Sequence, residues 1–138
     1  MSTVVLLSCS SRKRRERTKA EYMYTGDLFR YSLLYARSLN PDRIYILSAK
    51  YWLIGLDREI DPYNESLNDM TASGRRSWSE KVLRELAKEN DLERDTFIML
   101  VGRRYREFLT ARIFHHQVPL EHMRIGEQLK YLKGMLDE

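Results

Sequence analysis

The chain has little cysteine, proline or glycine: one, three and six residues among 138. A single cysteine excludes an internal disulfide framework. So few glycines and prolines, beside 43% hydrophobic and 32% charged residues, exclude a low-complexity chain and are typical of a folded soluble protein. A chain of this length can bury an ordinary core without disulfides or a structural metal. We expect one domain, residues 1–138.

Long apolar runs are also lacking. No window approaches the roughly 20 apolar residues of a membrane-spanning helix. Only five apolar residues precede the first polar loop, too few for a signal peptide. We therefore expect a cytoplasmic protein without a membrane partner. The histidines His115, His116 and His122 have no convincing metal-ligand spacing, and one cysteine cannot complete a thiolate site, so we expect neither metal nor cofactor.

Basic residues concentrate in a few places. The net charge is +4 and the pI is about 9.2, a modest preference for anionic partners. Residues 12–19 are strongly basic, residues 103–106 form a second basic group, and most acids lie between residues 57 and 95. A basic edge on a near-neutral body is typical of a protein that contacts phosphate. A solvated cationic surface is the alternative interpretation.

Apolar periodicity predicts strands that alternate with helices. Continuously apolar runs, typical of buried strands, occupy residues 3–8, 42–48 and 96–101, with a weaker candidate at 115–120. Helices are predicted from the N-cap Thr25 to Asn40-Pro41, from Thr71 to Asn90, briefly after Gly102, and over residues 125–136. This alternation predicts an α/β fold, a small three-layer domain with a mainly parallel sheet of about four strands and helices on both faces.

Polar and basic residues follow each of the three clear strands. In open parallel sheets ligands bind beyond the carboxyl ends of the strands, so these loops should meet at one edge. The three loops are Ser8-Cys9-Ser10-Ser11-Arg12-Lys13, Ser48-Ala49-Lys50-Tyr51 and Gly102-Arg103-Arg104-Tyr105. Serine hydroxyls and free backbone amides bind oxyanions, lysine adds a point charge and arginine forks two donors onto one phosphate. We expect a shared anion pocket there.

Single residues in these loops have plainer alternatives. Lys50 could be an ordinary surface lysine. Gly102 could leave room at the positive end of a helix, or could be a packing glycine. Cys9 could be a thiolate activated by nearby cations, or a small apolar residue that ends a buried strand.

The long stretch between residues 49 and 70 carries several acids and aromatics. It is longer than a compact domain usually allows without a function. Asp61 and Glu65 are candidates for proton transfer or for accepting a ribose hydroxyl, and a polar surface loop is the alternative. Tyr24, Tyr51 and Tyr63 could stack on nucleobases or belong to the core.

Several stretches together resemble a family of small bacterial, archaeal and phage domains often labelled peroxide-stress YaaA-like proteins. They are SCSSRK, YTGDLFR, ILSAKYWLIGLDREIDPYNESL, VGRRYREFL and VPLEHMRIGEQLKYLK. The resemblance implies functional positions at Ser8, Cys9, Ser10, Lys13, Tyr24, Thr25, Gly26, Phe29, Arg30, Ser48, Ala49, Lys50, Tyr51, Pro62, Tyr63, Gly102, Tyr105, Gly126 and Gln128. Trp52 departs from the pattern, which usually has glycine there.

The opening cysteine-serine loop is also similar to one in the core domain of archaeosine synthase, which modifies a deazaguanine base in transfer RNA. YaaA itself is associated with oxidative DNA damage and DNA binding. Both resemblances imply a partner that is nucleic acid or a nucleotide-like anion; fold analogy alone establishes no reaction.

Three functions follow as hypotheses. The first is an enzyme that acts on a nucleobase, nucleotide or modified base by glycosidic-bond or base-modification chemistry. The second is a non-catalytic DNA- or RNA-binding module in stress response or phage defence, and the third is a thiol sensor at Cys9. The catalytic candidates are Cys9, Lys50, Asp61 and Glu65. The ligand-binding candidates are Ser8, Ser10, Ser11, Lys13, Tyr24, Thr25, Gly26, Arg30, Ser48, Tyr51, Tyr63, Gly102, Arg103 and Tyr105.

Overall fold

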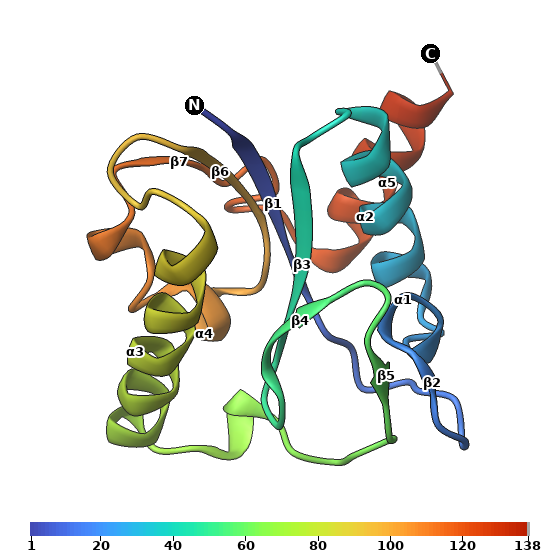
Figure 1. Ribbon diagram of the computed structural model, residues 1–138. Coiled ribbons are helices and arrows are strands. Elements are labelled where there is room, and N and C mark those ends of the chain that lie inside the picture. The colour runs from blue at the N-terminus through green and yellow to red at the C-terminus, as the bar shows by residue number, and fades with distance from the viewer. Residues whose placement is uncertain (138) are drawn as a thin grey trace.

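A central five-stranded sheet organises the chain in the computed structural model, which describes residues 1–137 (Figure 1). Its strands are β1 (Thr3–Ser8), β3 (Arg43–Ser48), β4 (Trp52–Gly55), β6 (Thr96–Leu100) and β7 (His115–Gln117). They lie in the order β4-β3-β1-β6-β7, and every neighbouring pair is parallel except β3 and β4. The fold is therefore α/β with a mostly parallel sheet, as predicted.

Helices cover both faces of this sheet. Figure 1 shows α2 (Asp27–Ser38) and α5 (Ile125–Leu136) side by side on one face, with α3 (Ala72–Glu89) and α4 (Arg103–Arg106) on the other. Alternate β1 residues point to opposite faces. Val5 and Leu7 join the α2 and α5 side of the core, whereas Val4 and Leu6 join the α3 side. Burial on both faces explains why this strand is apolar throughout.

The stretch between residues 49 and 70 is more ordered than the sequence predicted. It contains β4, the short strand β5 (Glu59–Ile60) and the 3₁₀ turn η1 (Leu67–Asp69). β4 folds back antiparallel on β3, and β5 pairs with β2 (Thr18–Lys19), which leads into α1 (Ala20–Met23). The sheet thus has five strands rather than about four. No two-residue turn signal such as Asn-Gly marks this hairpin, so its local sequence did not predict β4.

The predicted helix caps have different outcomes. Thr71 is confirmed, because its side chain accepts a hydrogen bond of 3.0 Å from the amide of Gly74. The prediction that Thr25 caps α2 is wrong, because the N-cap residue is Gly26, which forms no side-chain hydrogen bond. The amide of Thr25 instead donates to the carbonyl of Arg12, beside the bridge that pairs Lys13 with Tyr24. This long-range pairing overrides the local capping preference.

The last part of the sheet and chain is short and partly irregular. The weak strand candidate at 115–120 forms only as β7, and the 3₁₀ turn η2 (Thr110–Arg112) precedes it. Among residues 1–137, no helix combines the length and the apolar character that crossing a membrane requires.

Candidate functional site

The loops after β1, β3 and β6 lie at one edge of the sheet. The amide of Gly102 donates to Ser8 Oγ at 2.8 Å, which joins the loop after β6 to the end of β1. The amide of Cys9 donates to the carbonyl of Leu47 at 3.2 Å, which joins the loop after β1 to the end of β3. Parallel topology therefore brings together residues that are distant in the sequence.

A pocket of about 500 Å³ opens at this edge. That volume is within the range of about 300–1,000 Å³ that is usual for small-molecule sites. Its lining includes six predicted site residues: Ser8, Cys9, Ser10, Gly102, Arg103 and Tyr105. It also includes Phe29 and Gln128, which the resemblance implies, and Arg104, which lies in the predicted anion-binding loop. The lining residues that the sequence did not predict are Leu28, Ser32, Asn68, Leu100, Val101, Arg106, Leu120, His122, Met123 and Ile125.

The pocket combines an apolar wall with a cationic rim. Phe29, Leu120 and Met123 contribute to the apolar part of the lining. Arg103 and Arg104 are exposed, and neither forms an ion pair within residues 1–137. α4 itself has only four residues, so these two side chains, rather than the end of that helix, supply the positive charge. The arrangement suits a ligand with a flat apolar part and an anionic group.

Cys9 is held next to the hydroxyl of a half-buried tyrosine, Tyr105. Its Sγ lies 3.2 Å from Tyr105 Oη, and the Tyr105 ring packs edge-on against Trp78 at 5.6 Å between ring centres. Trp78 Nε1 donates to the carbonyl of Ser48, which fixes the indole. Burial raises the pKa of Tyr105, and negative charge on Cys9 raises it further. Tyr105 therefore keeps its proton at neutral pH, and its hydroxyl can donate a hydrogen bond to the Cys9 sulfur.

Two more tyrosines form a buried hydroxyl cluster. Tyr24 Oη and Tyr63 Oη are 2.6 Å apart, and Ser48 Oγ lies 2.8 Å from Tyr63 Oη. Tyr24 and Tyr63 are 4% and 6% exposed, so their rings belong to the core and cannot stack on an external base. Desolvation raises the pKa of both hydroxyls, which stay protonated. Half-buried Tyr51 packs edge-on against Tyr63 at 5.7 Å.

The ammonium group of Lys13 lies against the same rings. Its Nζ is 4.5 Å from the ring centre of Tyr63 and 5.9 Å from that of Tyr24. Partial burial lowers the pKa of Lys13, while negative charge on Cys9 and Glu65 acts in the opposite direction. The Lys13 side chain therefore packs against the tyrosine cluster instead of extending into solvent with the rest of the basic loop.

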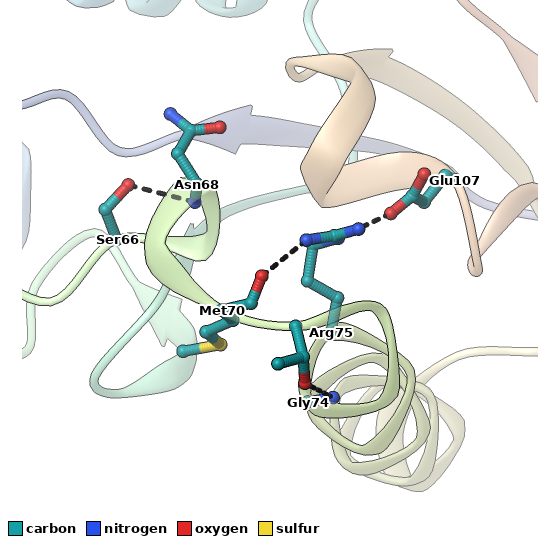
Figure 2. A network of polar contacts seen from close by, with 7 residues as sticks. Ser66, Asn68, Met70, Gly74, Arg75 and Glu107 are labelled. Carbon is teal, nitrogen blue, oxygen red and sulfur yellow. Dashed lines mark hydrogen bonds and ion pairs between the residues drawn. The ribbon is translucent and has the colours of Figure 1, made fainter.

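A largely buried ion pair connects two segments that line the pocket. Arg75 Nε donates to Glu107 Oε1 at 2.7 Å, and Arg75 Nη1 donates to the carbonyl of Met70 at 2.6 Å (Figure 2). These bonds connect α3 to η1 and to the residue that follows α4. Because η1 carries Asn68 and α4 carries Tyr105, one guanidinium positions two segments of the pocket lining.

Three predicted catalytic residues lie outside the pocket. Lys50 is exposed, with its Nζ 5.4 Å from the Tyr51 ring centre. Asp61 is exposed and forms an ion pair of 3.1 Å with Arg17, and Glu65 is exposed as well. No aspartate or glutamate is among the described residues that line the pocket. The structure therefore leaves Cys9 as the one predicted catalytic residue at the pocket.

The remaining predicted ligand-binding residues also lie outside the pocket lining. Ser11 and Thr25 are exposed, and Arg30 pairs with Asp27 at 3.3 Å. Gly26 lies close to Ser10: a Cβ at Gly26 would be 3.6 Å from Ser10 Oγ. Within residues 1–137, no group of three histidine, cysteine or acidic side chains is arranged to hold a metal ion.

Residues 4–134 match the pattern of a protein family described as Family of unknown function (DUF6884). The chain belongs to this family. No curated protein and no solved structure matches it. The DUF6884 description names no activity, so the resemblance to YaaA-like proteins and to archaeosine synthase stays a prediction.

The segment around residues 120–123 is a part of this DUF6884 site that periodicity could not reveal. Leu120, His122 and Met123 line the pocket because β7 pairs with β6 and delivers the following chain to the same edge. This segment has no helical or strand period of its own. Only the resemblance, which includes Gln128, pointed to this region of the chain.

Proposed function

We propose that this protein is an enzyme that acts on a nucleotide or on a nucleobase in nucleic acid, with the pocket at the sheet edge as its substrate site. One observation carries the proposal: an apolar wall and two arginines without ion pairs adjoin a cysteine thiol in a single pocket. The resemblances of the cysteine-serine loop support the same substrate class.

The pocket matches the two halves of a nucleotide. A planar base packs well against the half-buried side chains of Leu28 and Met123, because aliphatic and thioether groups are apolar and the thioether is polarizable. A phosphate is bound by Arg103 and Arg104, whose guanidinium groups can each donate two parallel hydrogen bonds. Ser10 adds a hydroxyl on the same lining.

Base modification is the reaction class that we favour. Glycosidic-bond chemistry driven by Asp61 or Glu65 requires a carboxylate at the substrate, and neither residue lines the pocket. A Cys9 thiolate can instead add to an electron-poor ring carbon of the base. The sulfur–carbon bond forms, and the ring double bond shifts its electron pair to a carbonyl oxygen. The neighbouring ring carbon of the resulting enolate then displaces the leaving group of an alkyl-donor co-substrate, which forms a new carbon–carbon bond. Loss of the ring proton from that carbon restores the double bond and expels the thiolate.

Binding is tested by isothermal titration calorimetry with AMP, GMP, CMP and UMP and with the corresponding nucleosides. We expect at least one monophosphate to bind about tenfold more tightly than its nucleoside, the usual effect of charge-assisted hydrogen bonds. The double variant Arg103→Ala/Arg104→Ala should remove that difference. Arg94→Ala is the matched control, since Arg94 is exposed before β6, at the opposite end of the sheet. Equal affinities for nucleotide and nucleoside would contradict the proposal.

The chemistry is tested by incubating the protein with transfer RNA or DNA and a small-molecule cell extract, followed by mass spectrometry of the digested nucleosides. We expect a changed nucleoside with the wild type and none with Cys9→Ala. That variant should keep its nucleotide affinity, because Cys9 contributes no charge-assisted bond to phosphate. Retained modification by Cys9→Ala would remove Cys9 from the mechanism.

A nucleic-acid-binding module remains the second candidate, and the exposed loop at residues 12–19 favours it. Arg12 and Arg15 are exposed and form no ion pair within residues 1–137, whereas Arg14 and Arg17 bond to Tyr22 and Asp61. On duplex DNA each neutralised phosphate contributes about −0.9 to the log–log salt slope. Arg12→Ala/Arg15→Ala should therefore flatten that slope by about 2, whereas Arg94→Ala should leave it unchanged. An unchanged slope in the double variant would exclude the loop as the contact.

A further inference from the structure

The hydroxyl cluster behind Cys9 has a fixed hydrogen-bond direction at one end. Ser48 Oγ accepts the backbone amides of Lys50 at 3.2 Å and of Tyr51 at 3.0 Å. With both amides donating to it, Ser48 Oγ directs its own hydrogen to Tyr63 Oη at 2.8 Å. Tyr63 Oη is therefore already an acceptor.

The two tyrosine hydroxyls therefore carry one more hydrogen than the cluster has acceptors for. Tyr24 Oη and Tyr63 Oη lie 2.6 Å apart, and only one hydrogen can occupy the space between them. The other hydroxyl hydrogen finds no acceptor within residues 1–137. Both side chains are more than nine-tenths buried, where an unused donor is costly. The cluster therefore has a spare donor without an internal partner.

A cation adds to this excess of donors. The Lys13 ammonium lies over the Tyr63 and Tyr24 rings, and it forms no ion pair within residues 1–137. Glu65 influences it only through longer-range attraction. The Lys13 ammonium and one hydroxyl hydrogen of the tyrosine pair therefore both lack an oxygen acceptor among the hydrogen bonds and ion pairs of residues 1–137. An oxyanion is the ligand that satisfies such a group of donors.

This cluster adjoins Cys9 but is separate from the arginine rim. Cys9 packs against the core cluster that contains Tyr24 and Tyr63, and Lys13 Nζ lies over both of these rings. None of Lys13, Tyr24 and Tyr63 lines the pocket that contains Arg103 and Arg104. Two separate sets of residues therefore place positive charge around Cys9: Lys13 with the tyrosine cluster, and Arg103 with Arg104 on the pocket rim.

We propose that Lys13 and the Tyr24–Tyr63 hydroxyl pair form a second anion subsite beside Cys9, which binds a phosphate of the substrate. Together with Arg103 and Arg104, the subsite selects a nucleotide that carries phosphates on both the 5′ and the 3′ oxygen. A nucleoside bisphosphate and an internal nucleotide of a polynucleotide share this chemistry. The identity of the substrate rests on the proposed function, whereas the anion subsite rests on the donors alone.

Calorimetry with uridine 5′-monophosphate, uridine 3′,5′-bisphosphate and a short oligouridylate tests the subsite. The wild type should bind the bisphosphate about tenfold more tightly than the monophosphate. Lys13→Met and the double variant Tyr24→Phe/Tyr63→Phe should lose this advantage and keep their monophosphate affinity within twofold. Tyr45→Phe is the matched control, because Tyr45 is a buried tyrosine whose hydroxyl bonds to Asn90 and Glu89 instead. A bisphosphate advantage that survives Lys13→Met overturns the proposal.

Inorganic phosphate separates this failure from failure of the proposed function. If no nucleotide binds but phosphate binds in a Lys13-dependent manner, the proposed function fails and the anion subsite stands. If nucleotides bind through the arginines and Lys13→Met changes no affinity, the subsite fails and the function stands. Preference for the oligonucleotide over the bisphosphate would identify a polynucleotide as the source of the second phosphate. Circular dichroism and thermal melting establish that each variant is folded. If Lys13→Met does not fold, Lys13→Gln takes its place in the same measurements.

Discussion

At the scale of single residues, Trp52 carries an unusual backbone conformation. Its φ is 61°, in the left-handed region that glycine adopts most easily, and glycine is what the resembled family usually has there. The indole ring in turn accepts the Lys81 ammonium at 3.5 Å from its ring centre. Trp52 thus combines a left-handed backbone at the β3–β4 turn with a cation–π contact to α3.

Two substitutions at Trp52 separate these effects. Trp52→Ala and Trp52→Gly both remove the ring, but only glycine relieves the left-handed conformation, which costs other residues about 1–2 kcal/mol. We expect Trp52→Gly to be more stable than Trp52→Ala by about 1 kcal/mol in urea denaturation. Equal stability, or a more stable alanine variant, would show that the turn carries no strain.

At the scale of elements, the pocket depends on the connection between α3, η1 and α4. Arg75 is 9% exposed at its side chain and Glu107 is 25% exposed, so their ion pair is largely withdrawn from water. Such a pair stabilises little compared with an apolar replacement, but removing one partner leaves a buried charge unpaired. The pair therefore acts mainly as a positioning device for Asn68 and Tyr105.

Substitution of this pair should be strongly non-additive. Arg75→Met should lower the free energy of unfolding by about 3 kcal/mol, because it strands the Glu107 carboxylate and the carbonyl of Met70. Arg75→Met/Glu107→Leu should recover much of that loss. Chemical denaturation of both single variants and of the double variant gives the coupling energy. Additive losses would mean that the two side chains stabilise the fold independently.

At the scale of the whole molecule, Asp95 ties the start of the chain to the loop before β6. Its carboxylate accepts the amide of Ser2 at 2.8 Å and the amide of Asp91 at 2.8 Å. The Ser2 amide, followed by the Asp91 amide, lowers the pKa of Asp95. These bonds connect residues that are 93 positions apart, and they set the register in which β1 enters the centre of the sheet.

The direction of this shift predicts how stability responds to acid. Because the folded-state pKa lies below the unfolded value, the contribution of Asp95 is complete above the unfolded value of about 3.9 and is lost as pH falls through the folded pKa. Asp95→Asn lacks this contribution. We therefore expect the variant to melt at a lower temperature than the wild type at pH 7, with the difference shrinking below about pH 4. A difference that is constant from pH 7 to pH 3 would contradict the assignment.

The sequence by itself determined the parts that follow from local pattern. The apolar runs at residues 3–8, 42–48 and 96–101 predict the three buried strands to within one residue, and Thr71 predicts a helix cap. These predictions succeed because apolar period and capping chemistry depend on neighbouring residues. Once the strands are parallel, topology places the loops that follow them at one edge. The meeting of Ser8 with Gly102 could therefore be anticipated.

Only the tertiary structure decided where the irregular segments put their side chains. Asp61 turns to Arg17, 44 residues away, and Tyr63 joins Tyr24, 39 residues away, and neither pairing has a local period. The same long-range packing leaves Lys50 outside the pocket and brings Lys13 onto the tyrosine rings. Loop side chains take their direction from burial and from distant hydrogen-bond partners, whereas strands and helices take theirs from the backbone repeat.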